Sequence, residues 1–212
     1  EAPDLGDFYH RLLYEFSLCL NKYGLSWQDL SPDITRQLVD EVWQEIVPEF
    51  GDGILESSFR NHYLAQRLGR VGLRTIQTLS SELSRSNFQP GSYEIRFGRG
   101  GSLPPLKISL DDGESMYIEG RIDRVDLFEN DQESFIRIID YKSGRRDLNL
   151  SDVYYGLNLQ LLVYLKALLD GGGLNTRKPV QPAGVLYVPI DDPLLKADDR
   201  QAELEELRAR EM

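Results

Sequence analysis

Hydrophobic residues recur three and four positions apart through the first part of the chain. This spacing covers residues 4–24, 31–46 and 55–85, and it places the apolar side chains on one face of an α-helix. The second stretch opens with Ser31 and Pro32, which suit the N-cap and the first helical position. The pattern therefore predicts a helical segment that ends before residue 90.

From residue 93 onwards, short apolar stretches alternate with loops rich in Gly, Pro and Asp. The predicted strands are 93–98, 106–110, 115–128 and 134–143. A helix over 152–170, capped by Ser151 and ended by the glycines at 171–173, leads to a last buried strand over 183–190. This order predicts an α/β fold in which a mixed β-sheet is flanked by helices, with an N-terminal helical segment. We divide the chain into a helical part (1–90), a sheet-containing core (91–195) and a charged C-terminal helix (196–212).

The strand predicted over 134–143 ends with an acid and a base. Because side chains alternate between the two faces of a strand, Asp140 and Lys142 share one face and lie side by side. A short hairpin leads back to the preceding strand, so Asp123 can lie opposite Asp140. Two converging carboxylates repel each other unless a raised pKa, a buried cation or a metal ion compensates.

Mg²⁺ (or Mn²⁺) suits these residue types, because it is a hard cation commonly held by one or two carboxylates together with a phosphate. The ammonium of Lys142 can neutralise a phosphate oxygen and orient the attacking water. The pair would then be half of a metal-dependent site that cleaves phosphodiester bonds. The alternative is a surface ion pair between Asp140 and Lys142, which is the commoner meaning of an isolated Asp-x-Lys.

Three further side chains are candidates for such a site. Gln160 and Tyr164 are four residues apart on the predicted helix, and they share a face with Gly156. An amphipathic helix with a polar edge is the simpler explanation of this pair taken alone. His10 is one of only two histidines. A single histidine on a helix is more often structural than a ligand, and His62 has no motif context.

Composition limits the setting of the site. The formal net charge of −11 argues by itself against a nucleic-acid binder, so any basic surface is local or supplied by a partner chain. The single cysteine, Cys19, excludes an internal disulfide and any cysteine-based metal site in this chain, and its apolar helical context favours burial. No apolar run is long enough to span a membrane, and no signal-peptide pattern opens the sequence. We expect a fragment of a larger cytoplasmic protein with no membrane partner.

Four sequence strings occur in the order expected for one group of nucleases. They are GDFYH (6–10), GRIDRVD (120–126), IIDYKSG (138–144) and YYGLNLQLLVYL (154–165). Together they resemble the RecB-type nucleases of the PD-(D/E)xK superfamily. With PAGVLYVPIDDPL (182–194), they are most similar to the AddB-type nuclease domains of bacterial AddAB helicase–nucleases. The resemblance implies a restriction-endonuclease-like fold with its nuclease core in residues 91–195.

The same resemblance implies an activity and roles for individual residues. It implies a Mg²⁺-dependent (or Mn²⁺-dependent) deoxyribonuclease in double-strand break processing and recombinational repair. The expected partners are DNA, in single-stranded form, and an AddA-like helicase subunit. The implied metal ligands are His10, Asp123, Asp140 and the backbone carbonyl of Tyr141. The implied catalytic residues are Asp123, Asp140, Lys142, Gln160 and Tyr164.

Some features depart from the family pattern or leave alternatives open. AddB-type domains carry four cysteines for a 4Fe–4S cluster, and Cys19 does not match a cluster ligand, so a cluster is expected only in the full-length protein. We assign DNA contacts to Arg121, Arg145 and Arg146, because phosphate contacts need cations but no particular sequence. Solvated loop arginines are an equal alternative. The alternative function is a catalytically silent nuclease-fold module that binds DNA or a helicase partner.

Overall fold

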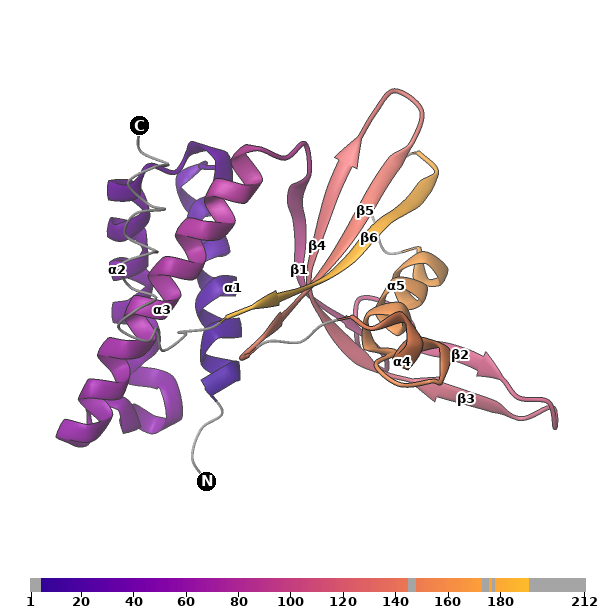
Figure 1. The fold of residues 1–212 in the computed structure, drawn as a ribbon, viewed down its shortest axis with the longest axis horizontal. Helices are drawn as coiled ribbons and strands as arrows, with labels where there is room; N and C mark the ends of the chain where they lie inside the picture. Colours follow the sequence, from indigo (N-terminus) through magenta and orange to yellow (C-terminus); the bar gives the residue numbers. More distant parts are fainter. Residues whose placement is uncertain (1–4, 145–147, 173–175, 177, 191–212) are drawn as a thin grey trace.

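The helical first part of the chain forms a group of three helices. The structure is a computed structural model that describes residues 5–144, 148–172, 176 and 178–190. Arg145, Arg146 and the helix predicted over 196–212 lie outside the described residues. The helices are α1 (Leu5–Tyr23), α2 (Pro32–Glu49) and α3 (Phe59–Ser84), joined through short 3₁₀ segments at Trp27–Asp29 and Phe50–Glu56 (Figure 1).

A mixed four-stranded sheet follows the helices. Its strands, in order across the sheet, are β1 (Gln89–Phe97), β4 (Gly120–Glu129), β5 (Ser134–Lys142) and β6 (Val180–Pro189). Neighbouring strands are antiparallel except β5 and β6, which run parallel. β2 (Leu106–Ser109) and β3 (Ser115–Ile118) form a separate hairpin that projects away from the sheet (Figure 1). The mixed sheet with flanking helices confirms the predicted α/β architecture.

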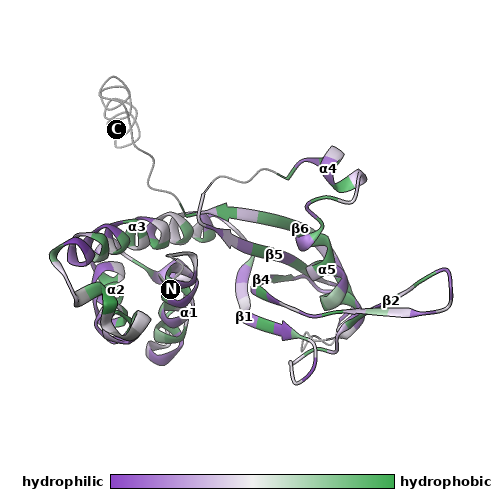
Figure 2. Cartoon of the chain, turned by 90° about the horizontal axis from the view of Figure 1, so that it is seen from below, coloured by the Kyte–Doolittle hydropathy of each residue, from purple (hydrophilic) through white to green (hydrophobic). Residues whose placement is uncertain are grey.

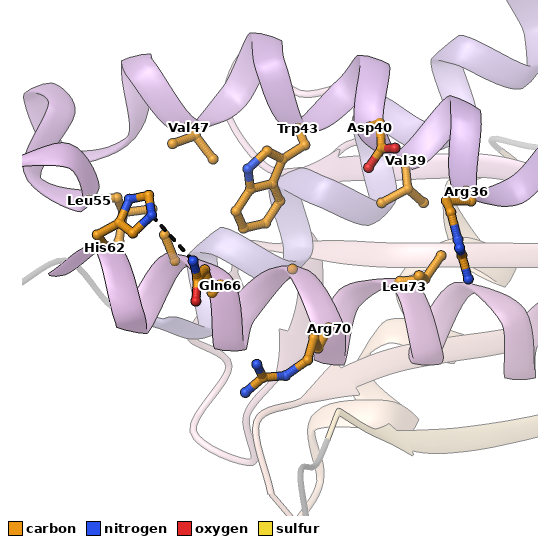
Figure 3. A pocket seen from close by; sticks show the side chains of 12 residues that line it. Arg36, Val39, Asp40, Trp43, Val47, Leu55, His62, Gln66, Arg70 and Leu73 are labelled. Carbon is orange, nitrogen blue, oxygen red and sulfur yellow. Dashed lines mark hydrogen bonds between the residues drawn. The ribbon is translucent and has the colours of Figure 1, made fainter. Parts of the chain in front are cut away.

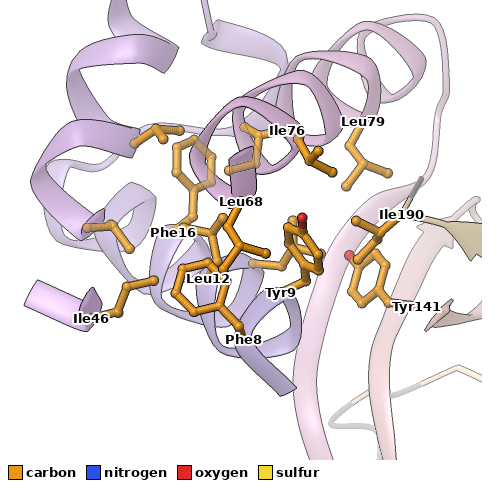
Figure 4. Close-up of a cluster of buried hydrophobic side chains, with 14 of the residues drawn as sticks. Phe8, Tyr9, Leu12, Phe16, Ile46, Leu68, Ile76, Leu79, Tyr141 and Ile190 are labelled. Carbon is orange, nitrogen blue, oxygen red and sulfur yellow. The ribbon is translucent and has the colours of Figure 1, made fainter. Parts of the chain in front are cut away.

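The three helices pack on one side of the sheet and α5 (Gln160–Gly171) on the other (Figures 1 and 2). On the helical side, apolar faces of α1 and α3 meet in a buried cluster that Ile139 and Tyr141 of β5 join (Figure 4). The helices come close at Gly72, where a Cβ atom would lie 2.3 Å from a methyl carbon of Leu12. This cluster fixes α1 against the strand that ends in Asp140 and Lys142.

A second buried cluster fills the other face of the sheet. It joins Ile136 and Ile138 of β5 to Leu161 and Leu168 of α5. The alternation along β5 therefore divides its side chains between two cores, as its sequence pattern predicts. Asp140 and Lys142 continue the row that faces α5.

Two predicted elements are each divided in the structure. The prediction of a single helix over 152–170 is wrong, because a turn separates α4 (Leu150–Tyr154) from α5. Gly156 lies in that turn with φ +79°, a left-handed conformation that glycine adopts readily, so it does not share a helical face with Gln160. The cap of α4 is Asn149 rather than Ser151, and the Asn149 side chain accepts a hydrogen bond from the Ser151 N–H. The strand expected over 115–128 is likewise two strands, β3 and β4.

Two expectations from composition can be compared with the structure. Cys19 is buried in α1, in agreement with its apolar helical context. Among the described residues, no helix combines the length and the apolar character needed to cross a membrane.

Candidate active site

The strand register brings the two predicted aspartates together. Arg124 of β4 pairs with Ile139 of β5, so the next positions along the two strands, Asp123 and Asp140, face each other. Both side chains are buried, with 7% and 2% of their surface exposed. The backbone N–H of Tyr141 donates to Oδ2 of Asp123 at 2.8 Å, which holds this carboxylate at the ends of the strands.

Helix α1 adds His10 to the aspartates. Its neighbours Phe8 and Tyr9 are buried in the helical core, so the amphipathic pattern of α1 places His10 at the border between core and sheet. Nδ1 of His10 lies 3.3 Å from Oδ1 of Asp123. The imidazole packs edge-on against the ring of Tyr141, with 5.9 Å between ring centroids.

A third acid, Glu94, completes a set of possible cation ligands. β1 places Glu94 opposite Asp123 across its ladder with β4. One ligand atom from each of His10, Glu94 and Asp123 lies within 4.8 Å of the others. Glu94 has φ +51°, and such left-handed backbone in a residue other than glycine costs about 1–3 kcal/mol and clusters at functional sites. The sequence motifs do not identify this residue.

Asp140 lies beside this set and is engaged by Lys142. Nζ of Lys142 lies 2.6 Å from Oδ2 of Asp140 and donates to Oε1 of Gln160 at 3.0 Å. Gln160 in turn donates to the hydroxyl of Tyr164 at 2.7 Å. The centroid of the Tyr187 ring lies 5.7 Å from the same Nζ atom. The structure thus joins the polar residues at the start of α5 to the acid–lysine end of β5.

Burial and mutual repulsion act on the ionisable groups of the site. Burial raises the pKa of Asp140, although the neighbouring Lys142 opposes this rise. Burial also raises the pKa of Glu94, with Arg121 opposing and Asp123 adding to the rise. For His10, burial lowers the pKa, but the surrounding carboxylates, Asp123 first, outweigh it and leave the pKa above its ordinary value. A histidine binds a cation in its neutral form, so the carboxylates that raise this pKa make proton binding compete with cation binding at His10.

These residues fit a hard divalent cation. Nδ1 of His10 is buried, meets no hydrogen-bond criterion among the described residues and lies 3.3 Å from Oδ1 of Asp123, so a neutral imidazole would offer this nitrogen to a ligand. Two carboxylates, Glu94 and Asp123, face the same space as this nitrogen. Oxygen ligands from carboxylates are those that Mg²⁺ and Mn²⁺ prefer. The donor set is thus suited to either ion.

Of the arginines predicted to contact DNA, Arg121 is the one that the structure describes. It extends from β4, and its Nε lies 2.9 Å from Oε2 of Glu94. Its side chain is 43% exposed. Arg121 therefore lies next to the cation ligands with part of its guanidinium open to solvent.

A separate pocket of about 500 Å³ lies between α2 and α3, away from these residues (Figure 3). Trp43, Val39 and Leu73 contribute to its apolar wall. His62 lies at one end of this pocket, and its Nε2 is 3.3 Å from Nε2 of Gln66. His62 belongs to no group of possible metal ligands among the described residues.

Comparison with known proteins identifies the family. A family model described as the PD-(D/E)XK nuclease superfamily matches residues 1–211. The chain belongs to the PD-(D/E)XK nuclease superfamily. The sequence Asp140-Tyr141-Lys142 has the spacing of the (D/E)XK part of that name. The residue before Asp123 is Ile122, so Asp123 has no proline directly before it.

Several relatives of this PD-(D/E)XK chain are named as one subunit of an ATP-dependent helicase/deoxyribonuclease. The chain is 44% identical over 198 residues to the protein of that name from Thermoanaerobacter sp. (strain X514), covering 93% of this chain and 17% of the relative. It is 43% identical over 203 residues to the protein from Clostridium novyi (strain NT), covering 96% and 18%. The protein from Acetivibrio thermocellus is 41% identical over 203 residues, with the same two shares. The chain thus spans under one fifth of the length of these relatives.

Proposed function

We propose that this chain is the Mg²⁺-dependent nuclease domain of a bacterial AddAB-type helicase–nuclease. The observation that supports this most directly is the His10, Glu94 and Asp123 donor set beside the Asp140–Lys142 pair. The reaction is hydrolysis of a DNA phosphodiester bond, with single-stranded DNA as substrate. Membership of a nuclease superfamily supports the reaction type. The name of the relatives supports DNA as the substrate.

The residues of the site have separate roles in this proposal. His10, Glu94, Asp123, Asp140 and the carbonyl of Tyr141 would hold the cation, either directly or through water. When bound, the cation would supply Lewis-acid polarisation of a phosphate oxygen and lower the pKa of water. Lys142 neutralises charge on the phosphate and orients the attacking water. Gln160 and Tyr164 hold the ammonium of Lys142 in place, since the three groups form one hydrogen-bonded chain.

The names of the relatives support a larger setting for this domain. A subunit of a helicase–deoxyribonuclease would receive its strand from an AddA-like helicase, which allows an acidic domain to act on DNA. Such a complex would process double-strand breaks for recombinational repair in the cytoplasm. A 4Fe–4S cluster would be held by segments of the full-length protein beyond the residues that form this site.

A catalytically silent module that binds DNA or a helicase partner is the second candidate. The net charge of −11 favours it, because an acidic chain is a poor binder of a free DNA strand. A silent nuclease fold has usually lost an acid or the lysine of its site. Here Asp123, Asp140 and Lys142 are all present in one cluster, so the nuclease is the better supported proposal.

The proposal is tested by cleavage of a labelled single-stranded oligonucleotide by the full-length protein, with Mg²⁺ or with EDTA. We expect cleavage only with Mg²⁺, and a loss of at least about a hundredfold in rate for Asp123→Asn, since the substitution removes a charge that faces the cation. Asp111→Asn, in the exposed turn between β2 and β3, is the control and should retain the full rate. Undiminished cleavage in EDTA, or by Asp123→Asn, would contradict the proposal.

Glu94 provides a second test, because sequence motifs do not assign it to the site. We expect Glu94→Gln to weaken Mn²⁺ binding by about 10- to 100-fold, the range known for groups that support a metal site. Isothermal titration of Mn²⁺ into the full-length variants measures this. Glu114→Gln, an exposed acid next to the β2–β3 turn, should bind Mn²⁺ normally. Unchanged affinity in Glu94→Gln would limit Glu94 to its ion pair with Arg121.

A further inference from the structure

Two arginines are direct partners across the β1–β4 ladder. Arg96 of β1 is in register with Arg121 of β4, so the two side chains emerge side by side from the same face. Like charges directly opposite each other in a sheet are destabilising. Glu94 forms an ion pair with Arg121 and also attracts Arg96 electrostatically, but within the described part of the chain no acid lies within ion-pair distance of Arg96. An anion bound between the two guanidinium groups would relieve their repulsion.

The arginine pair lies where two hollows meet. One hollow, of about 530 Å³, lies between α1 and strands β1 and β4, and its lining includes His10 and Glu94 of the cation donor set. The other, of about 380 Å³, lies at the end of β1 and includes Arg99 and Gly100. Arg96 and Arg121 line both hollows. A ligand could therefore extend from the cation donors past the arginine pair to the turn that follows β1.

The turn after β1 is open to solvent at Gly100, whereas Gly98 is buried against Glu119. Gly98 and Gly100 have φ of +140° and +73°, values that side-chain-bearing residues rarely adopt. A Cβ atom on Gly100 would have no neighbour within 4 Å, so this part of the turn is open to solvent. Arg99 between them is exposed and makes no ion pair among the described residues. Its backbone N–H donates to Glu119 at 3.0 Å, which fixes the turn against the start of β4.

Acidic groups also line the two hollows, and they set the balance of charge. Asp7 and Glu94 line the first hollow and Glu119 lines the second. Arg11 of α1 also lines the first hollow, but it is paired with Glu49. Glu94 is the acid closest to Arg121, and it also belongs to the cation donor set. A divalent cation there would engage Glu94, so the three arginines Arg96, Arg99 and Arg121 would outnumber the two remaining acids, Asp7 and Glu119, along this path.

We propose that Arg121, Arg96 and Arg99 bind successive phosphates of the nucleic-acid strand on one side of the scissile bond. The inference rests on the proposed function, because that function places the scissile phosphate at the cation donors. It extends the DNA contact predicted for Arg121 to two residues that no motif identifies. It also gives the strand a direction of approach, along the β1 edge of the sheet and between that edge and α1.

A phosphodiester strand fits this path better than a single small anion or an acidic protein segment. A free phosphate would occupy only the Arg96–Arg121 pair and leave Arg99 without a ligand. An acidic peptide would bring its carboxylates into contact with Asp7 and Glu94 on the same wall. A nucleic-acid strand has regularly spaced charges, and it must in any case continue from the cleavage site into the adjoining space.

The test is binding of a fluorescent oligothymidylate by the full-length protein, with Ca²⁺ present and at several salt concentrations. We expect Arg96→Gln to weaken binding by about tenfold, because it removes a charge-assisted hydrogen bond to a phosphate. The slope of log affinity against log salt should fall by about 0.7 for each phosphate that is no longer neutralised, and so by about 1.4 in Arg96→Gln/Arg99→Gln. The melting temperature of Arg96→Gln should not fall, since the substitution removes a repulsion.

Arg85→Gln, at the C-terminal end of α3, removes an equally exposed arginine away from both hollows and should bind like the unmodified protein. Equal weakening in Arg96→Gln and Arg85→Gln would overturn the proposal, because the effect would then reflect net charge alone. Unchanged affinity and salt slope in Arg96→Gln/Arg99→Gln would overturn it directly. Inorganic phosphate that competes fully at equal phosphate concentration would identify a single-anion site instead. Arginine-dependent binding without Mg²⁺-dependent cleavage would support the strand contacts of the three arginines, and it would reject the nuclease proposal and with it the scissile bond beside them.

Discussion

Replacing Lys142 with methionine is expected to lower the rate of DNA cleavage by about a thousandfold, the upper range for loss of one preorganised electrostatic group. Methionine keeps most of the length of the side chain and removes its charge. The ammonium contacts Asp140 and Gln160 and is not one of the cation donors, so Mn²⁺ binding should persist. Single-turnover cleavage and Mn²⁺ titration of the same variant measure the two effects separately.

Lys166→Met is the matched control for this experiment. Lys166 is exposed on α5 and pairs with Asp170 one turn away. We expect this variant to cleave at the normal rate, because surface pairs of this kind contribute little. A parallel loss of cleavage and Mn²⁺ affinity in Lys142→Met would show that the lysine organises the cation site. A normal rate would leave Lys142 with only its structural contacts to Asp140 and Gln160.

The residues of the candidate active site that could be predicted are those governed by local rules. Strand alternation places Asp140 beside Lys142, and the short β4–β5 hairpin places Asp123 opposite Asp140. Helical spacing places Gln160 one turn from Tyr164, and their hydrogen bond depends on that spacing alone. Each of these relations involves neighbours in one element or across one tight connection. The sequence specifies such relations directly.

Glu94 could not be found in this way. Its contact with Asp123 depends on the register between β1 and β4, and the β2–β3 hairpin is inserted between those two strands. Hydrophobic alternation predicts which side chains share a face of each strand. It does not predict which residues of two strands pair when a long segment is inserted between them. The positive φ of Glu94 is also opposite to the preference of a glutamate, so no local pattern predicts it. The sequence shows only that Glu94 alternates with apolar residues in the strand YEIRF (93–97). This pattern is typical of a residue that faces solvent.

The break between α4 and α5 has a different cause. Hydrophobic spacing continues from residue 152 to 170, so periodicity alone predicts one helix. Gly156 and Asn158 both adopt positive φ, which ends α4 and allows α5 to start again at Gln160. This break affects the candidate site, because it places Gln160 in the first turn of α5, where Gln160 accepts a hydrogen bond from Lys142.

A buried charge network behind the site is the feature least expected from composition. Asp126 is fully buried, with its Oδ1 2.7 Å from Nε of Arg124 and its Oδ2 2.7 Å from Nη2 of Arg137. Arg124 is itself only 2% exposed and donates to the hydroxyl of Tyr141 at 2.8 Å. The backbone N–H of Tyr141 holds Asp123. The network therefore connects the interior of the sheet to the cation donors.

Asp126→Asn is expected to lower the free energy of unfolding by about 3–5 kcal/mol, because it leaves the buried charge of Arg124 without its counter-ion. Chemical denaturation of the 212-residue chain measures the loss. Asp170→Asn makes the same substitution in the exposed pair with Lys166, and it should change stability by less than about 0.5 kcal/mol. Equal effects of the two substitutions would mean that the network contributes no more than a surface ion pair.

If the larger loss is found, Mn²⁺ affinity measured on the folded variant should also fall, since Arg124 anchors Tyr141 and Tyr141 positions Asp123. A stability loss with unchanged Mn²⁺ affinity would confine the role of the network to holding the sheet together.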